Sequence, residues 1–405
     1  MLTRRIRWAA LALAATALTA CGSHVDGSAR PAEIDVRTLD VGNYVTDPLE
    51  TRYHYHPSLS NGTILAEMRL ESQVATGPEI DPRLKYGTGS KAFDAAEDAA
   101  QILAKVSQPV LEADGMMFGF AAGSVDRPKT EDGDLPPDSV HTLTVVMQFP
   151  DAAAATKAAA DLESVDFQVA ADINQPVPLA KYPEAHAHWR PGIPTLGSFL
   201  AHGSYVVNTM VAVKDPDLAP LTELTQKVYD AQLPLLDALK PLDREGILRL
   251  PWDPDGMLRQ TLNVDGFGIP DNESQFASGE RGLLHQVSDQ DHWRRVLSDN
   301  GVDRFALSGM PFEGSTMLLR ARDPEAARKL WSTILEPLYP GQVDAPPKVP
   351  DARCGEGKQD TLNDKKRFRC AITYRRYVAT VDSDQLSDVY QRAAAQYALL
   401  ANSTW

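Results

Sequence analysis

Apolar and polar positions along the chain predict one strand–helix unit that occurs twice. In residues 144–162, the apolar run TVVMQF is typical of a buried strand, and the alanine-rich PDAAAATKAAADL after it is typical of a helix. Residues 315–335 repeat this order as STMLLRAR followed by DPEAARKLWSTIL. Asp151 and Asp323, 172 positions apart, stand where each helix begins, and a carboxylate there accepts hydrogen bonds from the first free N–H groups.

A second pair of strands keeps this spacing. Strands are predicted over 205–213 and 377–381, and each precedes a helix whose apolar residues recur at helical intervals. These apolar residues are Leu221, Leu224, Val228, Ala231, Leu235 and Leu239 in the first helix, and Leu386, Val389, Ala393, Tyr397 and Leu400 in the second. The dipeptides Ala231-Gln232 and Ala395-Gln396 occupy matching places, and Pro234 is expected to kink the first helix.

The repeated pattern predicts an α+β protein of two tandem, related halves. Each half is expected to be a mostly antiparallel sheet with helices packed on one face. The alternative is that the two similarities arose by chance. The proline-bearing stretch 240–257 is the expected connection. The expected division is a leader over 1–20, a tether over 21–35, an α+β domain over 36–240, and a second over 241–405 that carries a disulfide.

Two further segments have a predicted structure. Gly87-Thr88-Gly89-Ser90-Lys91 resembles a phosphate-binding loop, but the Walker pattern requires glycine directly before the lysine and a hydroxyl residue directly after it. Because Ser90 and Ala92 occupy those places, we expect only a turn over Gly87–Gly89 that leads into a helix over Lys91–Val106. The apolar residues Met116–Ala122 are expected to form a core strand.

The first twenty residues have the zones of an export signal. Three arginines among the first seven residues precede the apolar residues 8–18, which are too few to span a bilayer, since a spanning helix needs about 20 residues. The Leu18-Thr19-Ala20-Cys21 stretch resembles the lipobox of bacterial lipoproteins. The resemblance implies cleavage between Ala20 and Cys21, and a diacylglyceryl group on Cys21. The alternative is an ordinary secretory signal with a chance cysteine.

Lipid on Cys21 predicts where the protein resides. Two acyl chains give stable anchoring, so we expect the protein in the cell envelope, at the outer face of the cytoplasmic membrane. Residues 22–33 would form a flexible tether. The chain has a formal net charge of −15, and losing residues 1–20 with their three arginines makes it −18. Such an acidic protein repels nucleic acid, so no nucleic-acid partner is expected.

Lipidation of Cys21 would leave two cysteines, Cys354 and Cys370, in an oxidising compartment. They enclose 15 residues, and closing a loop of that length stabilises a fold by about 3 kcal/mol in the chain-entropy model. A two-thiolate metal site would need a nearby histidine or third cysteine, and a redox pair favours C-x-x-C spacing. The sequence has neither, so we expect a disulfide.

No motif in the sequence predicts catalysis. The G-x-S-x-G pattern of serine hydrolases is absent. Asp132 with Asp134, and Asp289 with Asp291, are interpreted as solvated charges rather than an acid–base pair. No cofactor is predicted.

Two histidine pairs are the candidate metal ligands. His54 with His56, and His186 with His188, have the H-x-H spacing that places two imidazoles on one face of a strand, and Glu184 lies near the second pair. The alternative, which we favour, is that these are surface histidines above aromatic neighbours and that no metal site exists.

The chain resembles an uncharacterised family of two-domain lipoproteins from mycolic-acid-producing actinomycetes. The resemblance rests on the lipobox, on Leu39-Asp40-Val41-Gly42-Asn43-Tyr44, on Pro254-Asp255-Gly256-Met257, and on Cys370 with the segments Arg376–Ala379 and Ala394–Tyr397. The resemblance supports the expected localisation in the cell envelope and the two-domain architecture, and it implies no enzymatic reaction.

Together these observations predict a lipid-anchored envelope lipoprotein that binds a partner and has no enzymatic activity. The partner is expected to be an envelope protein or an apolar ligand. The alternatives are an envelope enzyme, hydrolytic or metal-dependent, whose site is not visible in the sequence, and a purely structural spacer. A ligand-binding protein should contain an apolar, enclosed cavity between sheet and helices or between the halves, and an enzyme should bring titratable groups together in a cleft. A spacer should show neither.

Overall fold

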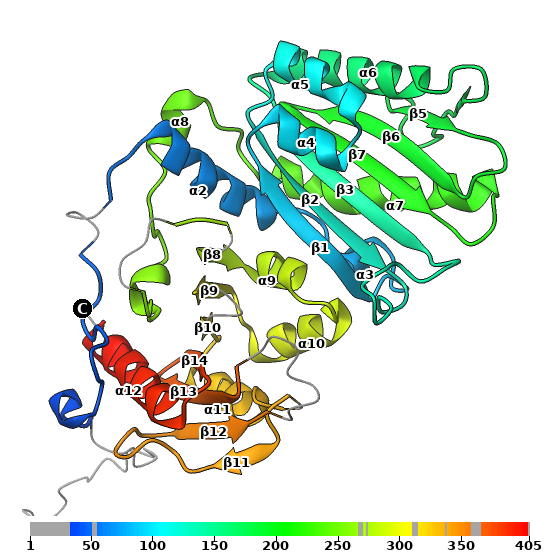
Figure 1. The fold of residues 1–405 in the computed structure, drawn as a ribbon. Coiled ribbons are helices and arrows are strands. Elements are labelled where there is room, and N and C mark those ends of the chain that lie inside the picture. Colours follow the sequence, from blue (N-terminus) through cyan, green and yellow to red (C-terminus); the bar gives the residue numbers. More distant parts are fainter. Residues whose placement is uncertain are drawn as a thin grey trace, which may run out of the picture. The chain divides into compact units, whose positions relative to one another are not determined.

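Two seven-stranded antiparallel sheets, one in each half of the chain, form the framework of the computed structural model (Figure 1). Residues 38–405 form one compact unit. The expected Ala20–Cys21 cleavage bond and His54 lie outside the described residues. The structure describes residues 33–50, 55–265, 270–272, 274–309, 315–336, 338–357 and 366–403.

The first sheet has the strand order β1-β2-β3-β7-β6-β5-β4, and every neighbouring pair is antiparallel. Its strands are β1 (Tyr86–Phe93), β2 (Phe118–Val125), β3 (His141–Gln148), β4 (Gln175–Pro176), β5 (His186–Trp189), β6 (Thr195–His202) and β7 (Tyr205–Ala212). All eight residues of β2 are buried, which confirms the predicted core strand.

The second sheet repeats the first one strand for strand. Its order from the opposite end is β8-β9-β10-β14-β13-β12-β11, again antiparallel throughout. Its strands are β8 (Gln275–Gly279), β9 (Arg304–Ser308), β10 (Thr316–Arg320), β11 (Gly341–Val343), β12 (Ala352–Glu356), β13 (Phe368–Tyr374) and β14 (Tyr377–Ser383). Adding seven to each strand number of the first sheet gives the strand in the same place of the second. This shared topology confirms the predicted α+β fold with two tandem halves.

Every α-helix described in the second half has a counterpart in the same place among the strands of the first half, which also has further helices. In the first half they are α2 (Leu59–Glu71), α3 (Gly77–Ile80), α4 (Ala96–Ile102), α5 (Gln108–Asp114), α6 (Ala152–Gln168), α7 (Leu218–Asp237) and α8 (Arg244–Leu248). In the second half they are α9 (Glu280–Gln286), α10 (Gln290–Asn300), α11 (Pro324–Thr333) and α12 (Leu386–Asn402). Short 3-10 helices are η1 (Val36–Thr38), η2 (Lys105–Ser107) and η3 (Leu258–Gln260).

Two of these helices begin as the sequence predicts. The Asp151 side chain accepts a hydrogen bond from the Ala154 N–H at the start of α6. The Asp323 side chain accepts hydrogen bonds from Glu325 and Ala326 at the start of α11. Each carboxylate satisfies N–H groups that have no partner within the helix.

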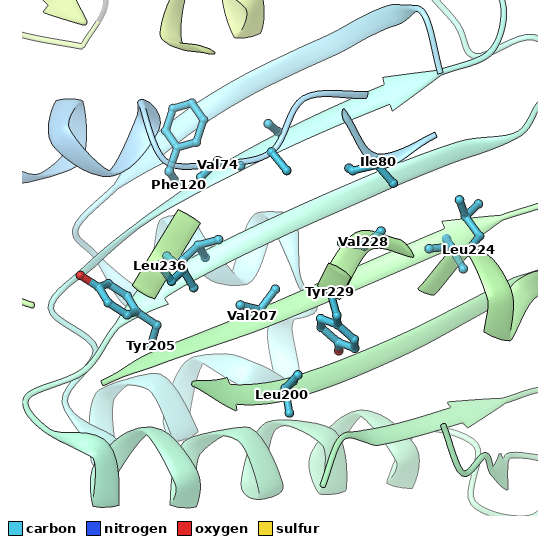
Figure 2. Packing of buried hydrophobic residues seen from close by; sticks show 14 of the residues in the cluster. Val74, Ile80, Phe120, Leu200, Tyr205, Val207, Leu224, Val228, Tyr229 and Leu236 are labelled. Carbon is cyan, nitrogen blue, oxygen red and sulfur yellow. The ribbon is translucent and has the colours of Figure 1, made fainter. Parts of the chain in front are cut away.

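Helices cover both faces of the first sheet, rather than one face as the pattern indicated. Val145 and Met147 of β3 pack with α4, α5 and α6 on one face. The next residue along the strand, Val146, packs with α7 and α2 on the other. Figure 2 shows this second core, where Val207 and Leu200 of the sheet lie beneath Leu236 and Val228 of α7. Both faces of the strands are apolar because both are buried.

The helix predicted over Lys91–Val106 is wrong over its first part. Tyr86–Phe93 form strand β1, and the helix, α4, begins only at Ala96. The turn expected over Gly87–Gly89 is also wrong, because these residues lie in β1. Gly89 has φ of +121° and stands at a shift in the pairing with β2, a conformation that glycine adopts without strain.

The predicted disulfide is present in the second half. Cys354 of β12 and Cys370 of β13 lie directly opposite each other and are bonded. Both sulfur-bearing side chains are buried. The α7 helix continues through Pro234 to Asp237. The expected boundary between residues 240 and 241 stays a prediction.

Candidate functional site

The histidine pair of β5 (His186–Trp189) lies at one side of the first sheet, next to α6. His186 is exposed, and His188 is half-buried against the edge of Phe167. The His188 Nδ1 atom lies 3.2 Å from Glu163 Oε1, and its Nε2 atom lies 3.9 Å from Asp166 Oδ2. The carboxylates beside His188 therefore come from α6, and not from Glu184.

The other histidine and aspartate residues that the sequence suggested, where described, also lie outside any group of three or more possible metal ligands. His56 is exposed on the described part of the chain. Asp289 accepts a hydrogen bond from the His292 N–H and begins α10, while Asp291 pairs with Arg294 and Arg295. Across the described ranges, there is no group of three or more His, Cys, Asp or Glu residues that could hold a metal ion.

A cleft of about 820 Å³ lies between the two halves, and we take it as the candidate site. Its volume is within the usual range for a small-molecule site, about 300–1,000 Å³. Its walls come from the second half of α2, residues 238–239, residues 250–258, residues 277–281 and residues 301–304. These segments are far apart in the sequence, so only the folded chain brings them together. We call this the inter-half cleft.

Helix α2 forms one wall of the cleft and belongs to both cores. Ala66 and Leu70 pack into the core of the first half, while Leu65 and Met68 pack into the core of the second. The helix begins at Ser58, whose hydroxyl accepts a hydrogen bond from the Asn61 N–H. Because apolar residues occupy two sides of α2, the helix lacks the single apolar stripe of a surface helix.

Two serine hydroxyls connect α2 to strand β8 at the cleft wall. The Ser72 and Ser278 Oγ atoms are 2.7 Å apart, and the Gly279 N–H donates to Ser72 Oγ over 3.0 Å. Ser278 also hydrogen-bonds the carboxyl group of Glu71, which accepts a further bond from Gln286 Nε2. A hydrogen-bonded chain thus runs from the cleft to a buried carboxyl group.

Two carboxyl groups, one helical turn apart on α2, are buried. Burial raises the pKa of Glu71 from 4.5 to about 7. Burial also raises the pKa of Glu67 to about 8, and the nearby charge of Asp94 adds to this, while a hydrogen bond from Asn272 opposes it. Both groups are therefore partly protonated near neutral pH.

The two halves are also joined by polar contacts outside the cleft wall. The Gln290 side chain accepts from the Gly77 N–H at 3.1 Å and donates to the Leu284 carbonyl. His285 is buried and hydrogen-bonds the Val74 carbonyl oxygen through Nε2 at 3.1 Å. Loss of hydration on burial lowers the pKa of His285 to about 4, so this ring is neutral at physiological pH.

Three arginines line the cleft, and their partners differ. Arg281 forms an ion pair with Glu79 at 2.8 Å, and Arg304 forms one with Asp255 at 2.7 Å. Arg69 instead donates one hydrogen bond, over 2.8 Å, to the backbone carbonyl of Lys240. The cleft therefore combines apolar side chains with fixed charges, which suits a ligand that has both apolar and polar parts.

Sequence reasoning did not find this site. A signal for it was the pair Glu67 and Glu71 at helical spacing within the apolar stretch LAEMRLE. Carboxyl groups inside an apolar helix are rarely buried without a specific role or partner. The remaining lining segments carry no shared motif.

No helix in the part of the chain that the structure describes is long and apolar enough to cross a membrane. Two family models match the chain. The N-terminal model of a domain of unknown function, DUF7373, matches residues 53–252, and the C-terminal model of the same domain matches residues 257–403. No curated protein and no solved structure matches the chain.

Proposed function

The chain belongs to the DUF7373 family, with both of its parts in order, and from this premise we propose that it is a lipid-anchored binding protein of the cell envelope. The proposal assigns ligand binding to the inter-half cleft and membrane attachment to Cys21. It places the protein among the lipoproteins of mycolic-acid-producing actinomycetes, which its sequence resembles.

The size and composition of the inter-half cleft carry the binding proposal. At about 820 Å³ the cleft could enclose a ligand of several hundred daltons. Its walls come from both halves, so a bound ligand would contact both. Binding to the folded form alone would stabilise that form by mass action.

The segment after the expected tether supports the anchoring proposal. Tyr44 donates a hydrogen bond from its hydroxyl to Asp388 of α12 over 2.6 Å, and Arg392 donates to the same hydroxyl over 3.1 Å. Val41 and Tyr44 also pack on Ala395 and Leu399. A lipid anchor upstream would therefore connect to a segment that is fixed on the folded protein, through the flexible residues that the sequence predicts.

The binding proposal is tested by native mass spectrometry of residues 22–405, exported from a related host. We expect a reproducible added mass that organic solvent removes. Ala238→Trp places a bulky side chain in the cleft from the exposed end of α7 and should abolish the added mass.

A control variant tests whether the loss of ligand depends on where the tryptophan is placed. Val169→Trp introduces the same side chain at the exposed end of α6, outside the cleft, and should retain the ligand. A clean apo mass in the wild type, or equal loss in both variants, would overturn ligand binding in the cleft.

A second candidate function is hydrolysis, and one observation favours it. Ser72 at the cleft is linked through Ser278 to Glu71, whose raised pKa suits a general base. In this scheme Ser72 attacks an ester carbonyl while its proton passes through Ser278 to Glu71, and the ester C–O bond breaks as the leaving alcohol takes that proton. Water then attacks the Ser72 acyl ester, and the released carboxylic acid restores the Ser72 hydroxyl. Ser72→Ala would abolish turnover of p-nitrophenyl butyrate if this scheme holds. Equal hydrolysis by the wild type and the variant would exclude it.

A further inference from the structure

Arg69 differs from the other arginines of the cleft because it contacts no carboxylate among the residues that the structure describes. Its guanidinium makes a single hydrogen bond, to the Lys240 carbonyl oxygen at 2.8 Å. Arg281 and Arg304, on the same cleft, are each neutralised by an acidic residue. Of the three arginines that line the cleft, Arg69 is therefore the one whose charge has no carboxylate contact within the described part of the chain.

The geometry of a guanidinium group determines which ligand it suits. Arginine has five N–H donors in a rigid planar fork, and this fork matches the two oxygens of a carboxylate or phosphate. The hydrogen bond to Lys240 uses one donor and holds the side chain in place. Because Arg69 lines the cleft and its other donors have no protein partner among the described residues, an anionic group in the cleft can bind them.

The surroundings of Arg69 define the rest of the ligand. Ser72 and Gln73, which follow Arg69 on the same wall of α2, can hydrogen-bond the polar part of a ligand. Leu65 and Met68 precede Arg69, and Leu250, Trp252, Leu258 and Val302 add apolar surface from other segments. The cleft therefore has a cationic place and an extended apolar wall within one cavity.

We propose that the inter-half cleft binds a single-chain amphiphile whose anionic headgroup is held by Arg69 and whose hydrocarbon chain lies along the apolar wall. This inference rests on the proposed binding function and specifies the chemical class of its ligand. The anionic group is a carboxylate or a phosphate, since both present paired oxygens to the guanidinium.

The test compares two fluorescent probes, 11-(dansylamino)undecanoic acid and its uncharged methyl ester, on residues 22–405. We expect Arg69→Gln to weaken binding of the acid by about tenfold or more, because a hydrogen-bonded charge contact contributes about 1.5–3 kcal/mol. Binding of the ester should change less than about twofold. Arg69→Lys keeps the charge and should restore part of the affinity for the acid.

Arg127→Gln is the control. Arg127 donates to the Pro137 carbonyl at 2.8 Å and pairs with Asp126 at 3.5 Å, and it lies outside the cleft. This variant should bind both probes as the wild type does. Inorganic phosphate is added as a competitor, and it should displace the acid only weakly, because it lacks a hydrocarbon chain.

The outcomes separate this inference from the binding proposal. If Arg69→Gln weakens both probes equally or neither, Arg69 does not recognise the headgroup, although the cleft still binds amphiphiles. If the ester fails to bind while phosphate displaces the acid at equal concentration, the site takes free anions and the inference is wrong. If neither probe binds the wild type, both proposals fail.

Discussion

Gln232 and Gln396 make the same pair of hydrogen bonds in the two halves of the protein. Gln232 accepts from the Ala75 N–H at 2.9 Å and donates to the Gln73 carbonyl at 2.8 Å. Gln396 accepts from the Leu262 N–H and donates to the Gln260 carbonyl, both at 2.7 Å. Each glutamine is fully buried on the long helix that follows the central strand β7 or β14.

This equivalence confirms the match of Ala231-Gln232 with Ala395-Gln396 in the sequence. In each half, one amide side chain satisfies an N–H and a C=O of a backbone segment that lies outside any strand. A buried backbone group without such a partner would cost free energy. The two halves thus share a polar contact as well as a topology, which supports their origin by duplication.

Replacing Gln232 should destabilise the fold. Gln232→Met keeps the shape of the side chain but leaves two buried backbone groups unpaired, so we expect a loss of about 2–4 kcal/mol in the free energy of unfolding. Urea denaturation followed by tryptophan fluorescence measures it. Gln101→Met, at an exposed position of α4, is the control and should change stability little. Equal stability of the two variants would contradict the structural role of the amide.

Stability should fall as pH rises from about 4.5 to about 8. The folded pKa values of Glu71, about 7, and Glu67, about 8, exceed the ordinary value of 4.5, so the folded state holds protons that the unfolded state releases. This contribution is complete below pH 4.5 and is lost through pH 7–8. For Glu71 the loss between pH 5.5 and 8.5 is about 2 kcal/mol.

Glu71→Gln tests this dependence, because the amide keeps the hydrogen bonds but does not titrate. Urea midpoints at pH 5.5 and 8.5 should differ less in this variant than in the wild type. Glu112→Gln, at an exposed position, is the control. An unchanged pH dependence in Glu71→Gln would show that Glu71 is ionised in the folded protein at all of these pH values.

Stability should also fall on the acid side, through His285. Its folded pKa of about 4 lies below the ordinary value of 6.5, so the unfolded state takes up a proton first. The contribution is present above pH 6.5 and is lost as pH falls toward 4, by about 2 kcal/mol between pH 6.5 and 4.5. His285→Gln should flatten this decline in thermal melts, whereas His56→Gln, at an exposed site, should not.

Loss of the lipid should release the protein from the membrane. Cys21→Ser removes the proposed acylation site, which precedes all the described residues, so we expect the protein in the soluble envelope fraction with an unchanged melting temperature. Fractionation with immunoblotting measures the first and thermal melts the second. A variant that is processed and still sediments with membranes would overturn the proposed anchor.

The sequence predicts those parts of the fold that depend on contacts between residues close together in the chain. Asp151 and Asp323 begin their helices through bonds to N–H groups two or three residues away, so the pattern alone places them. The β1 strand was missed because Lys91 and Ala92 favour helices, whereas pairing with β2 decides their conformation. The cleft was missed because Arg69 and Val302 meet only in the folded chain.

Because α2 packs into both cores, the protein cannot be cut between its halves without disrupting a core. A fragment ending near residue 240 would keep α2 but expose Leu65 and Met68, which normally pack against the second half. A fragment beginning there would lose those two side chains from its own core. Neither half is therefore a self-sufficient module, and the two should unfold in one cooperative step. Although the two halves repeat one topology, the smallest unit that folds is the two halves together.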